Sequence, residues 1–495
     1  MVSGDHKYQS KKNRLVVKSL SLDPSVIYNK KNMIQNISQM WRDPKQSIDR
    51  IGIVADGVSR ILIIANYDNQ LKFSVAGPSN IDYGSLNSIN ELKSTNDIND
   101  PKSNSIVADP INLKHHRKDS VVGVIYKAPH YVNIKKNSKH LAVTISVSDP
   151  KKKYMQENII IKVYRVPVIL VHGVWSDEEG SWEDTGFKQF LEGHGFWAAT
   201  VDYREHNAKT FDPCAEPEIG NPAIAALKSR ILEVLDIYNK QQHISASQVD
   251  IVAHSMGGLI ARGLCQQNGY KAKENYMKGQ IRRLITIGTP HFGAGLAGIL
   301  YRLKDNWYSY NEPSIALWNS IYENEKNSKY KRLQLKNIYS KKKSSLDQGA
   351  VESLAPDSAA YSNLRRTNVK SYAIAGSWKP DATTSYEIME KYFRNISGNP
   401  FFSLDRDGFH EDNDLQVSIS SQLGGLDGKH RRSEDKNPPK YGAIYMNTLH
   451  SSSFKINDSK KVSAELWSTL IQEDVTNLLG SSDDNFADTI GTVSS

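Results

Sequence analysis

The sequence predicts an α/β fold, a mainly parallel sheet with helices on both faces, preceded by an all-β region. Three observations lead to this prediction. From about residue 166 onward, short apolar strands alternate with helical patterns, which is typical of a parallel sheet. One of these strands runs directly into a helix through Ser255. Between residues 46 and 165, short strands follow one another at turn signals with no helical pattern between them.

The length and composition are those of a globular protein. The chain has 495 residues, enough for two to four domains, with 39% apolar and 24% charged residues. No apolar run approaches the roughly 18 residues needed to span a bilayer, and the polar N-terminus shows no secretory signal. Three alternatives follow: the protein stays where it is made, it is exported without a cleaved signal, or the sequence is a processed form of a longer protein. We expect a secreted or exported protein in preference to a cytoplasmic one.

Basic residues outnumber acidic ones, 63 against 54, which gives a net charge of +9 at pH 7. This excess suggests affinity for anionic surfaces, and peripheral contact with an anionic membrane is one hypothesis. Nucleic acid is not an expected partner because no binding motif accompanies the charge. Cys214 and Cys265 are expected to be ordinary thiols, with a single disulfide as the alternative.

The first 45 residues form a polar segment with one predicted helix, around residues 33–41. A β-sandwich is predicted for residues 46–165. In one of its strands Val143 and Ile145 face one side and Thr144 the other, so one face is buried. The predicted strands cover residues 51–55, 59–65, 71–75, 121–126, 141–147 and 159–163.

Two stretches of the β region resemble bacterial immunoglobulin-like repeats of the invasin type. They are Ala-Asp-Gly-Val-Ser at residues 55–59 and Tyr-Lys-Ala-Pro at residues 126–129. The resemblance implies a spacer, adhesion or scaffold role, with a protein partner bound through the β-sandwich. A plain structural β domain that packs on the next domain is the alternative.

The catalytic domain is predicted for residues 166–480, with a polar, disordered tail at 481–495. Reactive residues would collect where its parallel strands end, at one edge of the sheet. Its strands are expected at residues 168–171, 197–201, 249–253, 284–287 and 369–375, and its helices at 187–193, from 222, after 255 and near the C-terminus around 466–478.

Two insertions, at about 292–345 and 380–412, interrupt the alternation of strands and helices. The first follows a strand of the sheet, where a cap or lid over a lipid-binding cleft would lie. Packing of its apolar side chains on the core is an equal alternative. These side chains form two helical stripes, Leu296, Ile299, Leu300 and Leu303, then Ile315, Trp318 and Tyr322.

Ser255 lies between an apolar, β-branched strand and a helical pattern. Ala253 and Gly257, two residues away on either side, are small enough for the tight turn that pushes a serine hydroxyl out of a sheet. The pattern predicts a nucleophile, with a surface Ser-Gly turn as the alternative. The amides of Met256 and Val174 are the expected donors to a developing oxyanion.

A nucleophilic serine needs a base, and the base needs an orienting acid. In a fold of this class the chain order is serine, acid, histidine, so Asp414 and His450 are the best-placed partners of Ser255. The rivals are Asp412, then Asp405 and Asp407, for the acid, and His410, which precedes the acid, for the base. We expect His254 to be a packing residue, His172 to be structural and His291 to brace the loops of the site.

Together, these motifs resemble the bacterial lipase and esterase branch of the α/β-hydrolase family over roughly residues 166–480. The shared stretches are His172-Gly173, residues 253–258, residues 288–293, Leu-Ala-Pro-Asp-Ser at 354–358, Asp414 with Val417, and His450-Ser451. The resemblance implies an α/β-hydrolase fold and a serine hydrolase that cleaves lipid esters through an acyl-enzyme. Ser255 would be the nucleophile, His450 the base and Asp414 its orienter. Two departures are Leu415-Gln416 after the acid and Ser418 where a proline is common.

Other functions remain open at this stage. The protein could be an adhesion or effector protein whose hydrolase-fold domain is a non-catalytic scaffold, or a lipid acyltransferase. The chemistry requires no cofactor. Residues 410–414, His-Glu-Asp-Asn-Asp, could hold calcium, although a solvated acidic loop is favoured. The lipid head group, the acyl-chain length and the choice between lipase and phospholipase do not follow from the sequence.

Overall fold

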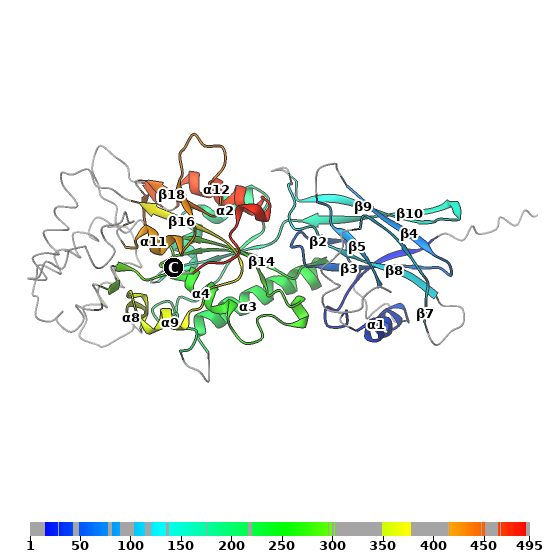
Figure 1. Cartoon of the computed structure of the whole chain (residues 1–495), viewed down its shortest axis with the longest axis horizontal. Helices are drawn as coiled ribbons and strands as arrows, with labels where there is room; N and C mark the ends of the chain where they lie inside the picture. The colour runs from blue at the N-terminus through cyan, green and yellow to red at the C-terminus, as the bar shows by residue number, and fades with distance from the viewer. Residues whose placement is uncertain are drawn as a thin grey trace, which may run out of the picture.

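The computed structural model shows an all-β part and an α/β part that lie end to end along the longest axis (Figure 1). The structure describes residues 15–491, with gaps at 28, 43–48, 78–81, 90–102, 114–119, 135–137, 175, 216–219, 296, 299–300, 302–348, 378–413, 415, 447, 451–463 and 466.

The α/β part is built on a seven-stranded sheet with the order β12-β11-β14-β15-β16-β18-β17. Each neighbouring pair in this sheet is parallel, as the alternation of strands and helices predicts. The strands are β11 (Val168–Val171), β12 (Ala198–Thr200), β14 (Val249–His254), β15 (Ile281–Ile287), β16 (Lys370–Ser377), β17 (Gly428–His430) and β18 (Gly442–Met446).

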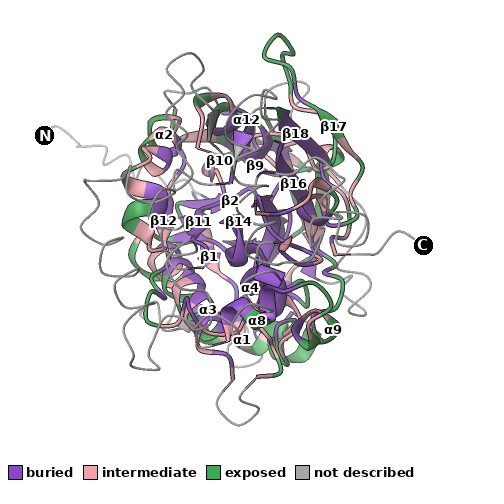
Figure 2. Cartoon of the chain, turned by 90° about the vertical axis from the view of Figure 1, so that its left-hand side faces the viewer, coloured by how far each residue is buried: buried purple, intermediate pink, exposed green. Residues whose placement is uncertain are grey.

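Helices cover both faces of this sheet. On one face, α3 (Pro222–Asp236) and α4 (Met256–Cys265) share a core with Ile251 of β14. On the other face, α2 (Phe187–Gly193) and α12 (Thr469–Leu479) share a core with Val252, the next residue of the same strand. Successive side chains of a strand point to opposite faces, so an apolar run without alternation is buried on both sides (Figure 2).

Shorter elements connect this framework. They are η4 (Glu179–Glu183), η5 (Ile237–Gln241), η6 (Lys273–Asn275), α8 (Ala350–Leu354), α9 (Ala359–Asn363), α11 (Ile419–Leu423), β19 (Thr448–Leu449), β20 (Ala464–Glu465) and η9 (Asp483–Asn485).

The all-β part consists of two sheets whose side chains share one hydrophobic core, which includes Phe73, Val124 and Ile145. One sheet has the order β1-β3-β8-β5 with β7 also on β8, and the other β13-β2-β10-β9-β4-β6. The strands are β1 (Val17–Ser21), β2 (Gly52–Val54), β3 (Arg60–Asn66), β4 (Leu71–Ala76), β5 (Ser85–Ser88), β6 (Ser105–Ala108), β7 (Ile111–Asn112), β8 (Ser120–Lys127), β9 (His140–Asp149), β10 (Lys152–Tyr164) and β13 (Ile244–Ser245).

The predicted strands of this region coincide with β2, β3, β4, β8, β9 and β10, whereas β1, β5, β6 and β7 were not predicted. The helix expected at 33–41 is α1 (Lys30–Arg42). Its fully buried Met33 and Ile37 join a core with Leu62 of β3, and β1 pairs antiparallel with β3. The described residues between 15 and 42 therefore belong to the all-β part. The immunoglobulin-like resemblance and the domain boundaries stay predictions.

The two parts are joined by backbone pairing. Ile244 and Ser245 form β13, which follows α3 in the chain yet pairs in parallel with β2 of the all-β part. Side-chain contacts reinforce this junction, because Ser245 Oγ donates to the carbonyl of Arg60 at 2.9 Å. The two parts are therefore joined by a shared sheet and by side-chain hydrogen bonds, and not by a linker alone.

The prediction of a disordered tail at 481–495 is wrong for the described residues up to 491. Phe486 and Ile490 are buried, and Asp483 forms an ion pair with the fully buried Arg283 at 2.6 Å. Backbone bridges connect Ala487 to Ser371 and Ile490 to Thr367. Although the segment is mostly polar, burial of Phe486 and Ile490 beside the sheet holds it in an ordered conformation.

Several expectations fall outside the described residues. Most of the first insertion, predicted at about 292–345, and all of the second, predicted at about 380–412, lie there, so the lid remains a prediction. Cys214 and Cys265 are free, as expected. Among the residues that the structure describes, no helix is both long and apolar enough to cross a membrane.

Candidate active site

Ser255 occupies the sharp turn between β14 and α4. Its backbone has φ 53° and ψ −131°, a conformation that residues other than glycine rarely adopt. The strand ends at His254 and the helix begins at Met256, so the serine is the sole residue of the connection. This is the geometry of a nucleophile elbow, in which strain holds a hydroxyl clear of the sheet.

The turn depends on glycines that let backbone segments approach closely. A Cβ atom at Gly257 would lie 2.5 Å from the carbonyl oxygen of His172. A Cβ atom at Gly258 would lie 2.3 Å from Oγ1 of Thr289. At Gly173, on the loop after β11, it would lie 2.8 Å from Cβ of Ser255. The absence of these side chains brings the loop that carries Val174 against the serine.

The structure brings Ser255, His450 and Asp414 together from three distant segments. The Ser255 hydroxyl donates to Nε2 of His450 at 3.0 Å, and Nδ1–H of His450 donates to Oδ2 of Asp414 at 2.6 Å. All three side chains are buried, with Asp414 fully so. The arrangement can move a proton from the hydroxyl to the imidazole while the carboxylate holds the ring.

Both carboxylate oxygens of Asp414 accept hydrogen bonds. Its Oδ1 accepts from the amides of Gln416 at 3.0 Å and Val417 at 2.8 Å, while Oδ2 accepts from His450. The amide of His450 also donates to the carbonyl of Asp414 at 3.2 Å. The unusual sequence after the acid therefore does not disturb its contacts, because backbone amides supply them.

Gln422 of α11 fixes the loop that carries Asp414, a role that no sequence pattern predicts. Its buried side-chain amide donates to the carbonyls of Val417 at 2.9 Å and Gly376 at 3.0 Å. Its oxygen accepts from the amide of Gly376 at 2.7 Å. The acid loop is thereby attached to the end of β16.

His254 contacts the backbone of His450. Its Nε2 lies 3.1 Å from the carbonyl oxygen of His450, which can only accept, so Nε2 carries the hydrogen. The ring also packs against Trp467, with centroids 4.5 Å apart. Burial holds the pKa of His254 well below its ordinary value. The predicted packing residue thus also holds the backbone of His450 in place.

His291 is buried among polar partners at the end of β15. Its Nδ1 accepts from Arg262 of α4 at 3.1 Å, so the hydrogen is on Nε2, which donates to Oγ1 of Thr286 at 3.2 Å. Burial, and then the Arg262 charge, hold the pKa of His291 well below its ordinary value. The His291 ring thus connects the loop after β15 to α4 through Arg262 and to β15 through Thr286.

The remaining predicted residues divide into two groups. Val174 lies on the loop after β11, and Met256 is the buried first residue of α4, next to Ser255. Their amides as oxyanion donors stay a prediction. The rivals Asp405, Asp407, His410 and Asp412 lie outside the described residues, as does most of the calcium candidate at 410–414.

A family model agrees with this architecture. Residues 223–399 match the model described as a PGAP1-like alpha/beta domain. The match contains Ser255 and ends before Asp414 and His450.

One curated protein is similar over a short stretch. "GPI inositol-deacylase A" of Yarrowia lipolytica (strain CLIB 122 / E 150) is 25% identical over 101 residues, which are 19% of this chain and 9% of that protein. The match therefore spans less than a tenth of the relative's length.

Solved structures with partial similarity include three bacterial enzymes. Lipase BlEst2 of Bacillus licheniformis in its mature form has a TM-score of 0.32 and 15% identity, over 63% of this chain and 90% of its own. Lipase 1 of Pelosinus fermentans has a TM-score of 0.35 and 14% identity, over 64% and 97%. Phospholipase PlaB of Legionella pneumophila has a TM-score of 0.33 and 13% identity, over 64% and 61%.

These likenesses are too distant to carry an argument about activity. The α/β part has an α/β-hydrolase-like fold, as the parallel sheet, the elbow at Ser255 and the matching family model indicate.

Proposed function

We propose that this protein is a serine hydrolase that cleaves carboxylic ester bonds of lipids through an acyl-enzyme. One observation carries the proposal. The Ser255 hydroxyl, Nε2 of His450 and the Asp414 carboxylate form a continuous hydrogen-bonded chain at 3.0 and 2.6 Å, on an elbow next to a helix N-terminus. Such a chain of nucleophile, base and orienting acid is the arrangement that activates a serine.

The first half of the reaction acylates Ser255. Its Oγ attacks the ester carbonyl carbon while Nε2 of His450 takes the hydroxyl proton, and the carbonyl electron pair moves onto oxygen. The amides of Met256 and Val174 stabilise that negative charge. When the intermediate collapses, the bond to the leaving alcohol breaks, and the alcohol receives the proton from Nε2.

Water completes the cycle by the same route. His450 takes a proton from water as the water oxygen attacks the acyl carbon, and returns the proton to Oγ of Ser255 as the carboxylic acid leaves. Throughout, Asp414 keeps the hydrogen of His450 on Nδ1 and stabilises the imidazolium that forms twice in each cycle.

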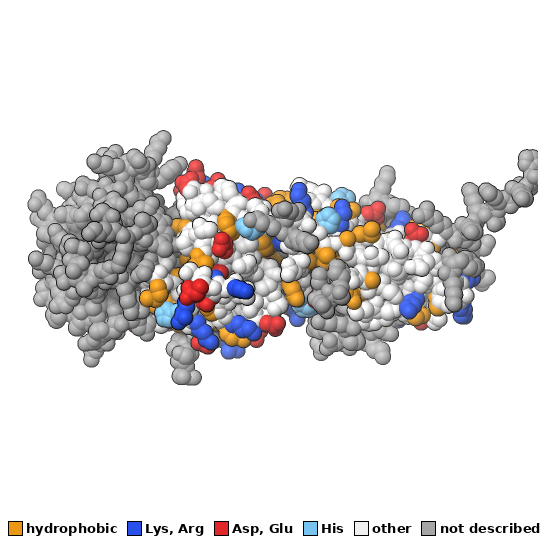
Figure 3. Space-filling model, turned by 90° about the horizontal axis from the view of Figure 1, so that it is seen from above, with side chains coloured by type: hydrophobic (Ala, Val, Ile, Leu, Met, Phe, Trp, Pro, Cys, Tyr) orange, Lys and Arg blue, Asp and Glu red, His pale blue; other side chains and the backbone are white. Residues whose placement is uncertain are grey.

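The lipid part of the proposal is supported by the family match and by the name of the curated relative, a GPI inositol-deacylase. The distribution of charge on the surface does not by itself indicate a substrate. On the face seen from above, basic and acidic side chains are interspersed (Figure 3). Contact with an anionic membrane and export from the cell remain part of the proposal.

A panel of esters tests both levels of the proposal. Wild-type protein is expected to hydrolyse a short-chain nitrophenyl ester, and Ser255→Ala to reduce turnover by at least about a thousandfold with its circular dichroism unchanged. Diacylphospholipids, triacylglycerols and an acylated inositol phospholipid then identify the preferred substrate. Transfer of the acyl group to added alcohol in place of water would reveal an acyltransferase. Retained ester turnover in Ser255→Ala would refute the proposal.

A further inference from the structure

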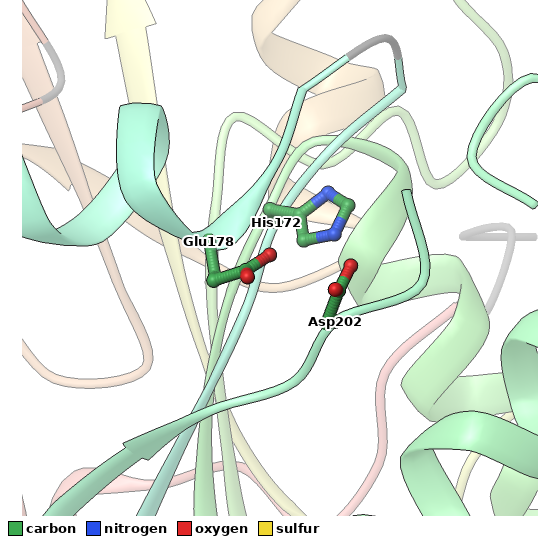
Figure 4. Close-up of side chains that lie close together, drawn as sticks. All are labelled: His172, Glu178 and Asp202. Atoms are coloured by element: carbon green, nitrogen blue, oxygen red, sulfur yellow. The ribbon is translucent and has the colours of Figure 1, made fainter. Parts of the chain in front are cut away.

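The side chains of His172, Glu178 and Asp202 lie close together (Figure 4). His172 follows β11, Asp202 follows the neighbouring β12, and Glu178 precedes η4. One nitrogen of the imidazole and one oxygen of each carboxylate all lie within 4.8 Å of one another. None of the three belongs to the hydrogen-bonded chain of Ser255.

His172 directs an unused lone pair into this cluster. Its Nδ1 lies 3.0 Å from the carbonyl oxygen of Gly173 and donates to it, so in the neutral ring Nε2 bears the lone pair. The ring is fully buried and stacks on Tyr203 with centroids 3.9 Å apart. Nε2 has no hydrogen-bond partner among the described residues, and Figure 4 shows it turned toward Asp202.

Glu178 contributes a second unused acceptor. Its Oε2 is buried and has no partner in the described part of the chain, while Oε1 accepts from Arg204. Nε of Arg204 also lies 3.0 Å from both oxygens of Asp202. One guanidinium therefore faces two carboxylates from the solvent side, where its side chain is 44% exposed. On the inner side, the lone pair of His172 Nε2 and the buried Oε2 of Glu178 meet without a donor in the described part of the chain, which costs free energy unless a proton or a cation joins them.

We propose that His172 Nε2, Glu178 Oε2 and the Asp202 carboxylate form a binding site for a divalent transition metal of the zinc class. Imidazole together with carboxylate oxygens is a usual zinc ligand set, with one position left open. Calcium and magnesium prefer oxygen ligands alone.

The site needs only a small contraction. Ligands at about 2.1 Å from one tetrahedral ion lie about 3.4 Å apart, against the present spread of up to 4.8 Å. Asp202 is half exposed and can rotate to close it. A bound ion would tie the ends of β11 and β12 to the start of η4, and so hold the loop with Val174 at both of its ends.

Zinc titration of the whole chain, stripped with EDTA, tests the site. We expect isothermal titration calorimetry to show one zinc ion per chain and the melting temperature to rise by several degrees with zinc. Glu178→Gln and the half-exposed Asp202→Asn should each weaken this binding by at least about tenfold. Glu183→Gln is the matched control, because its partner is the surface residue Lys188, and it should bind zinc as wild type does.

A substitution of Arg204 distinguishes a metal site from a cluster held together by ion pairs alone. Arg204→Gln removes the competing cation and should tighten zinc binding several-fold. Zinc affinity that is unchanged or weaker in Arg204→Gln, or that survives in both Glu178→Gln and Asp202→Asn, would overturn the proposal. Absence of stoichiometric binding by the wild-type chain would overturn it as well, and would leave Arg204 as the partner of both carboxylates.

Discussion

Ser255 shows how a single residue can store strain for chemistry. Its positive φ costs on the order of 1–3 kcal/mol for a side chain other than glycine. The surroundings hold the turn in this conformation, because Gly257 and Gly258 of α4 lie directly against His172 and Thr289. The close packing of β11, α4 and the loop after β15 therefore maintains a conformation that the serine alone would not adopt.

Replacement of Asp414 tests the acid of the site. Asp414→Asn keeps the shape but accepts less strongly from Nδ1–H of His450, so the ring loses its orientation. We expect kcat to fall by about a thousandfold or more with a nitrophenyl ester. Asp412→Asn, the rival from the sequence, is the matched control and should keep more than half of wild-type activity. The reverse ranking would assign the acid to Asp412.

The residues of the site differ in how far the sequence could predict them. Ser255 is marked by local signals, a strand, a small-residue turn and a helix. Asp414 and His450 follow from chain order and resemblance, and the structure places them at hydrogen-bond distance, while their roles stay predictions. Gln422 and the contact of His254 with His450 were missed, because no pattern in the sequence encodes a hydrogen bond between distant segments.

At the scale of elements, β14 and β15 are connected to the all-β part by one buried arginine. Arg282 forms a two-pronged ion pair with the fully buried Asp250, in which Nε and Oδ1 are 2.8 Å apart. Its Nη1 also donates to the carbonyls of Ala55 at 2.9 Å and His130 at 3.0 Å. A single side chain thus satisfies a buried carboxylate and two carbonyls of the neighbouring part.

Arg282→Met should be strongly destabilising, because it leaves Asp250 charged, buried and unpaired. We expect a loss of about 3–5 kcal/mol in the free energy of unfolding, measured by urea denaturation. Lys240→Gln is the control, since its pair with Asp236 is exposed and should contribute less than about 0.5 kcal/mol. An unchanged urea midpoint for Arg282→Met would show that the junction does not depend on this side chain.

Long strands with a clear hydrophobic pattern could be predicted from the sequence, whereas short strands and polar segments that pair with distant parts of the chain could not. The strands β3 and β8 carry continuous apolar runs, and β14 carries one that only Asp250 interrupts, which identifies all three without any knowledge of the fold. In contrast, β13 has only two residues, and residues 481–491 are mostly polar, so neither shows a hydrophobic period. Their positions are decided by partners far away in the chain, β2 and the edge of the sheet near Ser371.

For the whole molecule, buried neutral histidines connect stability to pH. Burial lowers the pKa of His172 to about 4 and holds the pKa values of His254 and His291 well below normal. In the unfolded chain each ring titrates near 6.5. As the pH falls below that value, the unfolded state binds protons that the folded state does not, so stability decreases.

We therefore expect the free energy of unfolding to fall by about 1 kcal/mol per buried ring between pH 7.5 and 5.5, measured by urea denaturation with EDTA present. Glu178, whose pKa is raised by burial, opposes this trend at lower pH. His291→Gln should reduce the slope by about a third, and His430→Gln, at an exposed position, should leave it unchanged. Constant stability across this range would contradict the assignment of neutral buried rings.

The most direct test of the reactive serine is labelling of the whole chain with a fluorophosphonate, followed by peptide mass spectrometry. The geometry predicts one modified residue, Ser255, and a labelling rate that falls by at least about a thousandfold in His450→Ala. Labelling at another serine, or no labelling of a folded protein, would contradict the claim that His450 activates Ser255.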